Sequence, residues 1–137
     1  MIRQAESRDA DAVLGLATDF ATSFVVDEPS FRASFAGLLS DPTAYLAVAE
    51  AEAKVVAYVL GFSHATFFAN GRIVWIEEIM VDTAYRRQGI GRSLLGSIEH
   101  WAATQGCPLI ALATRRAAEF YRTMGYHESA TYFRKLL

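Results

Sequence analysis

The sequence predicts a mixed α/β fold in which a mostly antiparallel sheet contains one strand–helix–strand crossover. Residues 45–51 and 54–64 are rich in strand-forming side chains and flank a short polar turn, which is typical of an antiparallel hairpin. A strand at 73–81 is followed by an amphipathic helix at about 90–105 and by a strand at 109–113, the order of a parallel crossover. With 137 residues, of which 53% are hydrophobic, the chain is expected to form one domain, 1–137, with a sizeable core.

The rest of the chain is expected to complete a sheet of about seven strands with about four helices. The additional elements are a first strand at 2–5, helices at about 9–20, 30–39 and 115–124, and two last strands at 126–129 and 131–136. Asn70-Gly71 is a hairpin-turn signal before the strand 73–81, and Gly61 marks a candidate bulge.

Composition limits the kinds of binding partner and the cellular location to be expected. A net charge of −2 provides no overall attraction for nucleic acid, and no apolar run reaches the length of a membrane span. Residues 1–6 lack the apolar core of a signal peptide, so a cytoplasmic location is expected. Cys107 is the only cysteine, which excludes an intrachain disulfide. The three histidines show no metal-ligand spacing with one another or with Cys107, so no metal is expected.

Residues 86–92, Arg-Arg-Gln-Gly-Ile-Gly-Arg, have the composition of an anion-binding turn at a helix start. The first amides of a helix lack acceptors and carry partial positive charge, which a diphosphate can satisfy. Gly89 and Gly91 have no Cβ, so oxygen atoms can approach the backbone, and three arginines add charge. The P-loop pattern is absent, and the third glycine of the dinucleotide fingerprint is replaced by Leu94. Spacing alone is equally compatible with a plain helix start flanked by solvated arginines.

Two segments together resemble the signatures of the GNAT superfamily of N-acetyltransferases. Arg86-x-x-Gly89-x-Gly91, after a strand that ends in Val81, resembles the acyl-CoA-binding motif of that family. Residues 117–126, Ala-Ala-Glu-Phe-Tyr-Arg-Thr-Met-Gly-Tyr, resemble its second signature, a helix with Phe-Tyr followed by Gly-Phe/Tyr. The resemblance is specific over 72–130. It implies an acetyl-CoA-dependent enzyme whose two central parallel strands splay apart, so that the pantetheine arm pairs with strand backbone.

The resemblance also implies which residues hold acetyl-CoA. The expected cofactor-binding residues are Ile79, Met80, Val81, Arg86, Arg87, Gln88, Gly89, Ile90, Gly91 and Arg92. A backbone amide near Met80 is expected to polarise the thioester carbonyl. Thr114 stands where the family often has an Asn that contacts the cofactor arm, so that contact stays open.

Three side chains are candidates for the chemistry. Glu77 is the candidate base, because similar small-amine acetyltransferases carry an acidic residue four positions before the strand-ending Val. Glu78 is a candidate substrate-binding residue and an alternative base, and water alone is a third possibility. Strand alternation predicts that Glu77 and Glu78 point to opposite faces. Tyr121 is the candidate general acid that protonates the departing sulfur, and its alternative is an aromatic core residue.

The acceptor is expected to be a small amine or a peptide amine that cannot be identified from the sequence. The resemblance places its pocket at residues 24–35, with Phe67 and Phe68 nearby, and Asp27 and Glu28 would make it acidic if they converge with the strand carboxylates. A homodimer is one arrangement to expect. The alternatives to an enzyme are a non-catalytic acyl-CoA sensor and a plain α/β interaction module.

Overall fold

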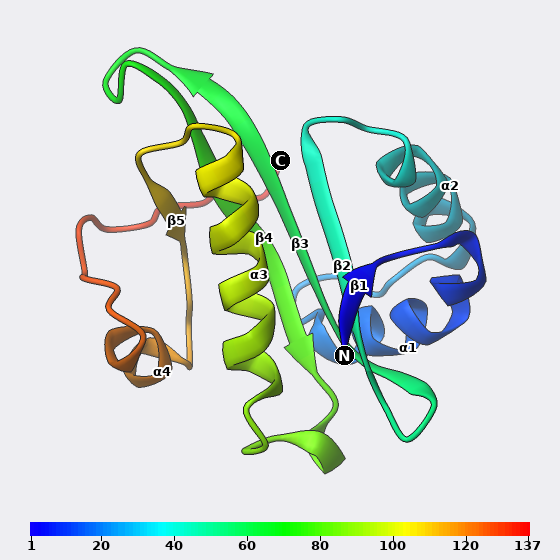
Figure 1. Ribbon diagram of the computed structural model, residues 1–137. Helices are drawn as coiled ribbons and strands as arrows, with labels where there is room; N and C mark the ends of the chain where they lie inside the picture. The colour runs from blue at the N-terminus through cyan, green and yellow to red at the C-terminus, as the bar shows by residue number, and fades with distance from the viewer.

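The computed structural model describes residues 1–137 and contains one five-stranded sheet with helices on both faces (Figure 1). The strands are β1 (Ile2–Gln4), β2 (Ala44–Ala51), β3 (Lys54–Thr66), β4 (Gly71–Val81) and β5 (Ile110–Leu112). The helices are α1 (Ala10–Phe20), α2 (Glu28–Leu39), α3 (Ile90–Thr104) and α4 (Ala118–Thr123), with short 3₁₀ turns at Ser7–Asp9 and Thr83–Tyr85. The strands are ordered β1 to β5 across the sheet, and only the β4–β5 pair is parallel. The predicted mixed fold with one crossover is confirmed.

Alternating side chains of β2, β3 and β4 divide the interior into two cores. The α3-side core contains Ala47, Ala49, Ala57, Val59, Val74, Ile76, Leu94, Leu95, Ile98, Ala102 and Tyr121. The α1–α2-side core contains Val13, Leu16, Phe35, Leu46, Val48 and Tyr58. Each core joins one face of the sheet to the apolar stripe of the helices that cover it. None of the helices combines the length and apolar character needed to cross a bilayer.

The two strands expected at 126–129 and 131–136 are not formed, so the expectation of about seven strands is wrong by two. Beyond α4 the chain passes behind the sheet without a ladder partner (Figure 1), and the guanidinium of Arg134 donates to the Ser23 hydroxyl, 2.8 Å away, between α1 and α2. The segment contains strand-forming side chains such as Phe133, but that side chain is 87% exposed. A strand also needs a partner edge, and β5 offers only three residues.

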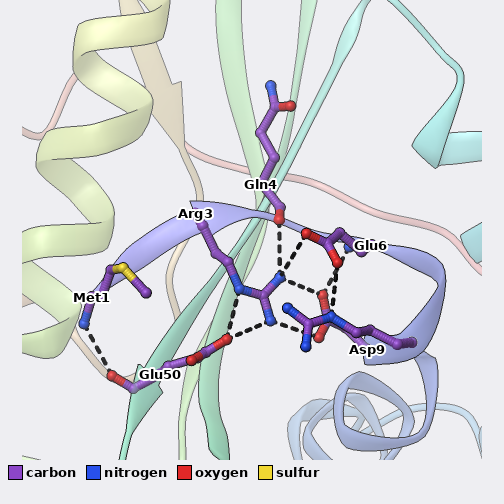
Figure 2. A network of polar contacts seen from close by, with 7 residues as sticks. Met1, Arg3, Gln4, Glu6, Asp9 and Glu50 are labelled. Carbon is purple, nitrogen blue, oxygen red and sulfur yellow. Dashed lines mark hydrogen bonds and ion pairs between the residues drawn. The ribbon is translucent and has the colours of Figure 1, made fainter. Parts of the chain in front are cut away.

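A partly buried ion-pair network fastens β1 to its neighbours (Figure 2). The guanidinium of Arg3 donates to both carboxylate oxygens of Asp9, at 2.8 and 2.9 Å, and to Oε1 of Glu50 on β2, at 2.6 Å. Asp9 is 4% exposed and also accepts from the backbone amide of Glu6, at 2.8 Å. The network therefore ties the first strand both to β2 and to the start of α1.

Replacing Asp9 by Asn is expected to lower the free energy of unfolding at pH 7 by about 2–3 kcal/mol. Breaking a fully buried ion pair costs somewhat more, about 3–5 kcal/mol, but here Arg3 retains its ion pair with Glu50. The Arg3 hydrogen bonds hold the pKa of Asp9 below its ordinary value. The stabilisation is therefore complete above the unfolded-state pKa near 3.9 and is lost as the pH falls through the lower folded-state pKa. Urea unfolding should show the two proteins converging in this acidic range. The exposed Asp11→Asn is the control, and a difference that persists in acid would contradict the ionic role.

Candidate active site

β4 and β5 are paired for only part of the length of β4. The last parallel pair joins Ile76 to Leu112, and β4 continues through 77–81 without a partner on that side (Figure 1). The two strands separate there, as the sequence predicted. Unpaired strand backbone must find other hydrogen-bond partners, so this stretch can pair with an extended ligand.

The hydrogen bonds to β3 show which amides of β4 face the open side. The amide of Asp82 donates to the carbonyl of Val56, 2.8 Å away, and so faces the β3 side. Because successive residues of a strand direct their amides to opposite sides, the amide of Met80 also faces β3. The amides of Ile79 and Val81 face the open side. The amide available to a ligand near Met80 therefore belongs to one of its neighbours.

A β-bulge interrupts β4 at the predicted catalytic carboxylates. Leu60 of β3 lies opposite Glu78, and the next residue, Gly61, lies opposite Ile76, which leaves Glu77 as the extra residue. Gly61 is the bulge position marked by the sequence. A Cβ there would lie 2.4 Å from the Cδ1 of Ile98 in the α3-side core. Glycine at this position therefore allows α3 to pack closely against the bulged hairpin.

The bulge brings both carboxylates to one face of the sheet. Ile76 and Ile79 both contact the α3-side core although they are three positions apart, so the alternation changes phase between them. Glu78 then lies on the α1–α2 side. Trp75 shares that face, and its indole nitrogen donates to Oε2 of Glu77, 3.3 Å away. The expectation that Glu77 and Glu78 point to opposite faces is wrong, because strict alternation stops at a bulge.

The two carboxylates have different surroundings. The hydroxyl of Tyr58, on β3, donates to Oε1 of Glu78 at 2.7 Å, and the Tyr58 side chain is only 1% exposed. Glu78 is half-buried, whereas Glu77 is exposed and has Trp75 as its hydrogen-bond partner. Sequence reasoning missed Tyr58, because no motif marks it. Only the register, which pairs Tyr58 with Met80, brings it to the face of Glu78.

The turn after β4 has the backbone of an anion site. Arg87 and Gly89 adopt left-handed conformations, with φ of 64° and 82°, and Gly89 precedes the first residue of α3. The amide of Ser93 donates to the carbonyl of Gly89, 3.0 Å away, as a first-turn helical bond. The amides of 90–92 therefore lie at the helix start without intrahelical acceptors. Together with the helix dipole they favour an anionic ligand.

The turn, the end of β4 and helix α4 meet at this helix start. The guanidinium of Arg86 bends back, and its Nε donates to the carbonyl of Val81, 3.1 Å away. A Cβ at Gly91 would lie 3.5 Å from Cζ of Phe120 and 3.8 Å from Cγ2 of Val81. Gly91 and Phe120, which are 29 positions apart in the sequence, thus bring the two sequence signatures together in space.

Tyr121 lies in the α3-side core and is 7% exposed. Its ring makes edge contacts with Phe120 and Tyr126, at centroid distances of 5.1 and 5.7 Å. Burial raises the pKa of its hydroxyl to about 12, and no hydrogen bond to another protein group contributes. The phenol is therefore a protonated donor at neutral pH. It is more buried than Phe120, which lies nearer the turn.

Thr114 is engaged within the protein. Its hydroxyl accepts from the amide of Ala117, 3.0 Å away, just before α4 begins. This local bond supports the start of the helix.

Phe67 and Phe68, which were expected near the acceptor pocket, do not lie beside the carboxylates. Phe67 and Phe68 lie on the β3–β4 turn, 103% and 74% exposed. Glu77 lies about 20 Å along β4 from Gly71, at about 3.3 Å per residue. The Asp27 carboxylate caps α2 by accepting from the amide of Ser30, 3.0 Å away. The Asp27 carboxylate is thus engaged at the start of α2.

The family assignment follows from the sequence comparison. The profile described as "Acetyltransferase (GNAT) family" matches residues 11–126. The chain belongs to the GNAT acetyltransferase family. This acetyltransferase is 30% identical over 144 residues to thialysine N-epsilon-acetyltransferase of Bos taurus, covering 91% of this chain and 82% of the relative. It is also 30% identical over 145 residues to aminoalkylphosphonate N-acetyltransferase of Salmonella typhimurium, covering 99% and 90%.

Solved structures show that the acetyltransferase shares its fold with the same family. Glucosamine-6-phosphate N-acetyltransferase from Arabidopsis thaliana is 21% identical with a TM-score of 0.88, covering 99% of this chain and 97% of that one. A transcriptional regulator from Bacillus halodurans is 23% identical with a TM-score of 0.90, covering 100% and 99%. AAC(6')-Iy, in complex with a bisubstrate analogue of coenzyme A and acetylneamine, is 18% identical with a TM-score of 0.84, covering 100% and 98%. At these identities the likeness concerns the fold alone.

Proposed function

We propose that this acetyltransferase moves the acetyl group of acetyl-CoA directly to a primary amine, with Glu77 as the base and Tyr121 as the acid. The observation that carries the proposal is the unpaired end of β4. This stretch carries the two carboxylates and leads into the anion-binding turn, and Phe120, the neighbour of Tyr121, packs at the start of α3.

The chain offers acetyl-CoA two sets of backbone donors. The amides of Ile79 and Val81 face the open side of β4, where they can pair with an extended arm and polarise a carbonyl. The amides of 90–92 and the arginines of 86–92 suit the diphosphate. These groups lie along one continuous segment, so a single ligand can satisfy both.

The transfer needs two proton movements. The amine nitrogen attacks the carbonyl carbon, the new C–N bond forms and the C–S bond breaks. An alkyl ammonium with a pKa near 10.4 costs about 4–5 kcal/mol to deprotonate at pH 7, which gives a base a purpose. Glu77 takes the amine proton, Tyr121 gives its proton to the sulfur, and solvent exchange restores both groups.

The adjacent carboxylates favour a cationic acceptor. Glu77 and Glu78 lie on one face of β4 and attract an ammonium group, whereas a phosphate or phosphonate close to the amine would be repelled. The names of the two sequence relatives give two acceptor types: thialysine, which carries no phosphorus oxyanion, and aminoalkylphosphonate, which carries one. We therefore favour thialysine-like amines over aminoalkylphosphonates.

An amine panel tests the function. Thiol release from acetyl-CoA is measured with thialysine, 2-aminoethylphosphonate, glucosamine 6-phosphate and neamine, and the two amines without phosphorus are expected to have the higher kcat/KM. N-acetylated thialysine is the control, since it has no ε-amine to acylate. A sensor would bind coenzyme A in calorimetry without turnover on any amine. An interaction module would show no binding heat, and either result would remove the proposed activity.

A further inference from the structure

Tyr58 places a hydroxyl donor beneath the carboxylate pair. It lies on β3, its ring belongs to the α1–α2-side core, and its hydroxyl donates to Oε1 of Glu78 at 2.7 Å. With 1% of Tyr58 exposed, this carboxylate is the partner that satisfies the hydroxyl. The contact crosses the β3–β4 ladder beside the bulge at Glu77.

The direction of this hydrogen bond is constant over the working pH range. Burial, and then the charge of Glu78, raise the pKa of Tyr58 far above that of an ordinary tyrosine. The phenol therefore remains a donor. Oε1 of Glu78 is occupied, and Oε2 is the oxygen left for another partner.

We propose that Tyr58 is a positioning residue for the acceptor amine, because it holds one oxygen of Glu78 and so orients the other toward the ammonium group. The inference rests on the proposed acetyl transfer and divides the work of the adjacent carboxylates. Glu78, held by Tyr58, binds and orients the acceptor. Glu77, which accepts only the longer bond of 3.3 Å from the Trp75 indole, takes the proton.

A double-mutant cycle tests this role with the best amine of the panel and acetyl-CoA. Tyr58→Phe removes only the hydroxyl and is expected to raise the KM for the amine roughly tenfold, the effect of one hydrogen bond to a charged group. kcat and the KM for acetyl-CoA should change less than twofold. Glu78→Ala should also raise the amine KM. The double variant should match Glu78→Ala within twofold, because Tyr58 acts through that carboxylate.

Tyr126→Phe is the matched control, since it breaks a tyrosine–carboxylate bond of the same length, 2.7 Å, between Tyr126 and Glu99. It should leave the amine KM unchanged. Thermal unfolding of every variant separates stability from binding. An amine KM unaffected by Tyr58→Phe, or a double variant worsened by the full tenfold, would overturn the positioning role. Absence of transfer by the unaltered protein to any amine would instead overturn the proposed function.

Discussion

Replacing Tyr121 by Phe is expected to lower kcat with the best amine by about 10²–10³-fold, within the range of about 10²–10⁴-fold that is typical of one general acid or base. Without the phenol, the sulfur leaves as an unprotonated thiolate. The ring stays in place, so its contacts in the α3-side core persist and the KM for acetyl-CoA should change little. Steady-state thiol release at saturating substrates measures the effect.

The raised pKa of Tyr121 adds a second expectation. Burial moves that pKa to about 12, so the acid form persists at higher pH than in a tyrosine with the ordinary pKa near 10. The kcat of the unaltered protein should therefore not fall through ionisation of Tyr121 near pH 10. Tyr126→Phe, which alters the neighbouring ring 5.7 Å away, is the control and should retain kcat. An unchanged turnover in Tyr121→Phe would remove Tyr121 as the acid.

Replacing Glu77 by Gln is expected to lower kcat/KM for the amine about 100-fold at pH 7, because the ammonium loses its proton acceptor. The loss should shrink as the pH approaches the amine pKa near 10.4, where the free amine no longer needs a base. The kcat/KM of both proteins measured across this range gives the test.

Glu119→Gln is the matched control for Glu77. Glu119 is an exposed carboxylate on α4 that pairs with Arg122, away from the bulge. Its replacement should leave the profile unchanged. A defect in Glu77→Gln that stays constant with pH would indicate binding rather than proton transfer. The absence of a defect would pass the base role to Glu78 or to water.

Local sequence patterns were sufficient to predict the strand–helix–strand crossover and the turn within it. The helix predicted at about 90–105 is α3, Ile90–Thr104, and the strand at 73–81 is the core of β4. Both carry strong periodicity and lie beside a glycine-containing turn, so nearby residues alone specify them. The mixed fold and its crossover could therefore be predicted from local patterns, and the acetyltransferase family from the resemblance of residues 86–91 and 117–126 to its two signatures.

Pairing between distant strands accounts for what could not be predicted. Glu77 and Glu78 share a face because β3 and β4 shift register at Gly61, where a Cβ would collide with Ile98 of α3. Residues 126–137 include strand-forming side chains such as Phe133, yet they pair with no strand.

The linear chain alone predicts the crossover and the glycine-containing turn at 86–92, because these depend on neighbours within a few positions, and the family resemblance implies the candidate acid and base. The common face of the carboxylates, the burial of Tyr121 and the hydrogen bond from Tyr58 emerge only in the folded molecule. They depend on register and close packing between segments far apart in sequence, and no local pattern encodes those contacts.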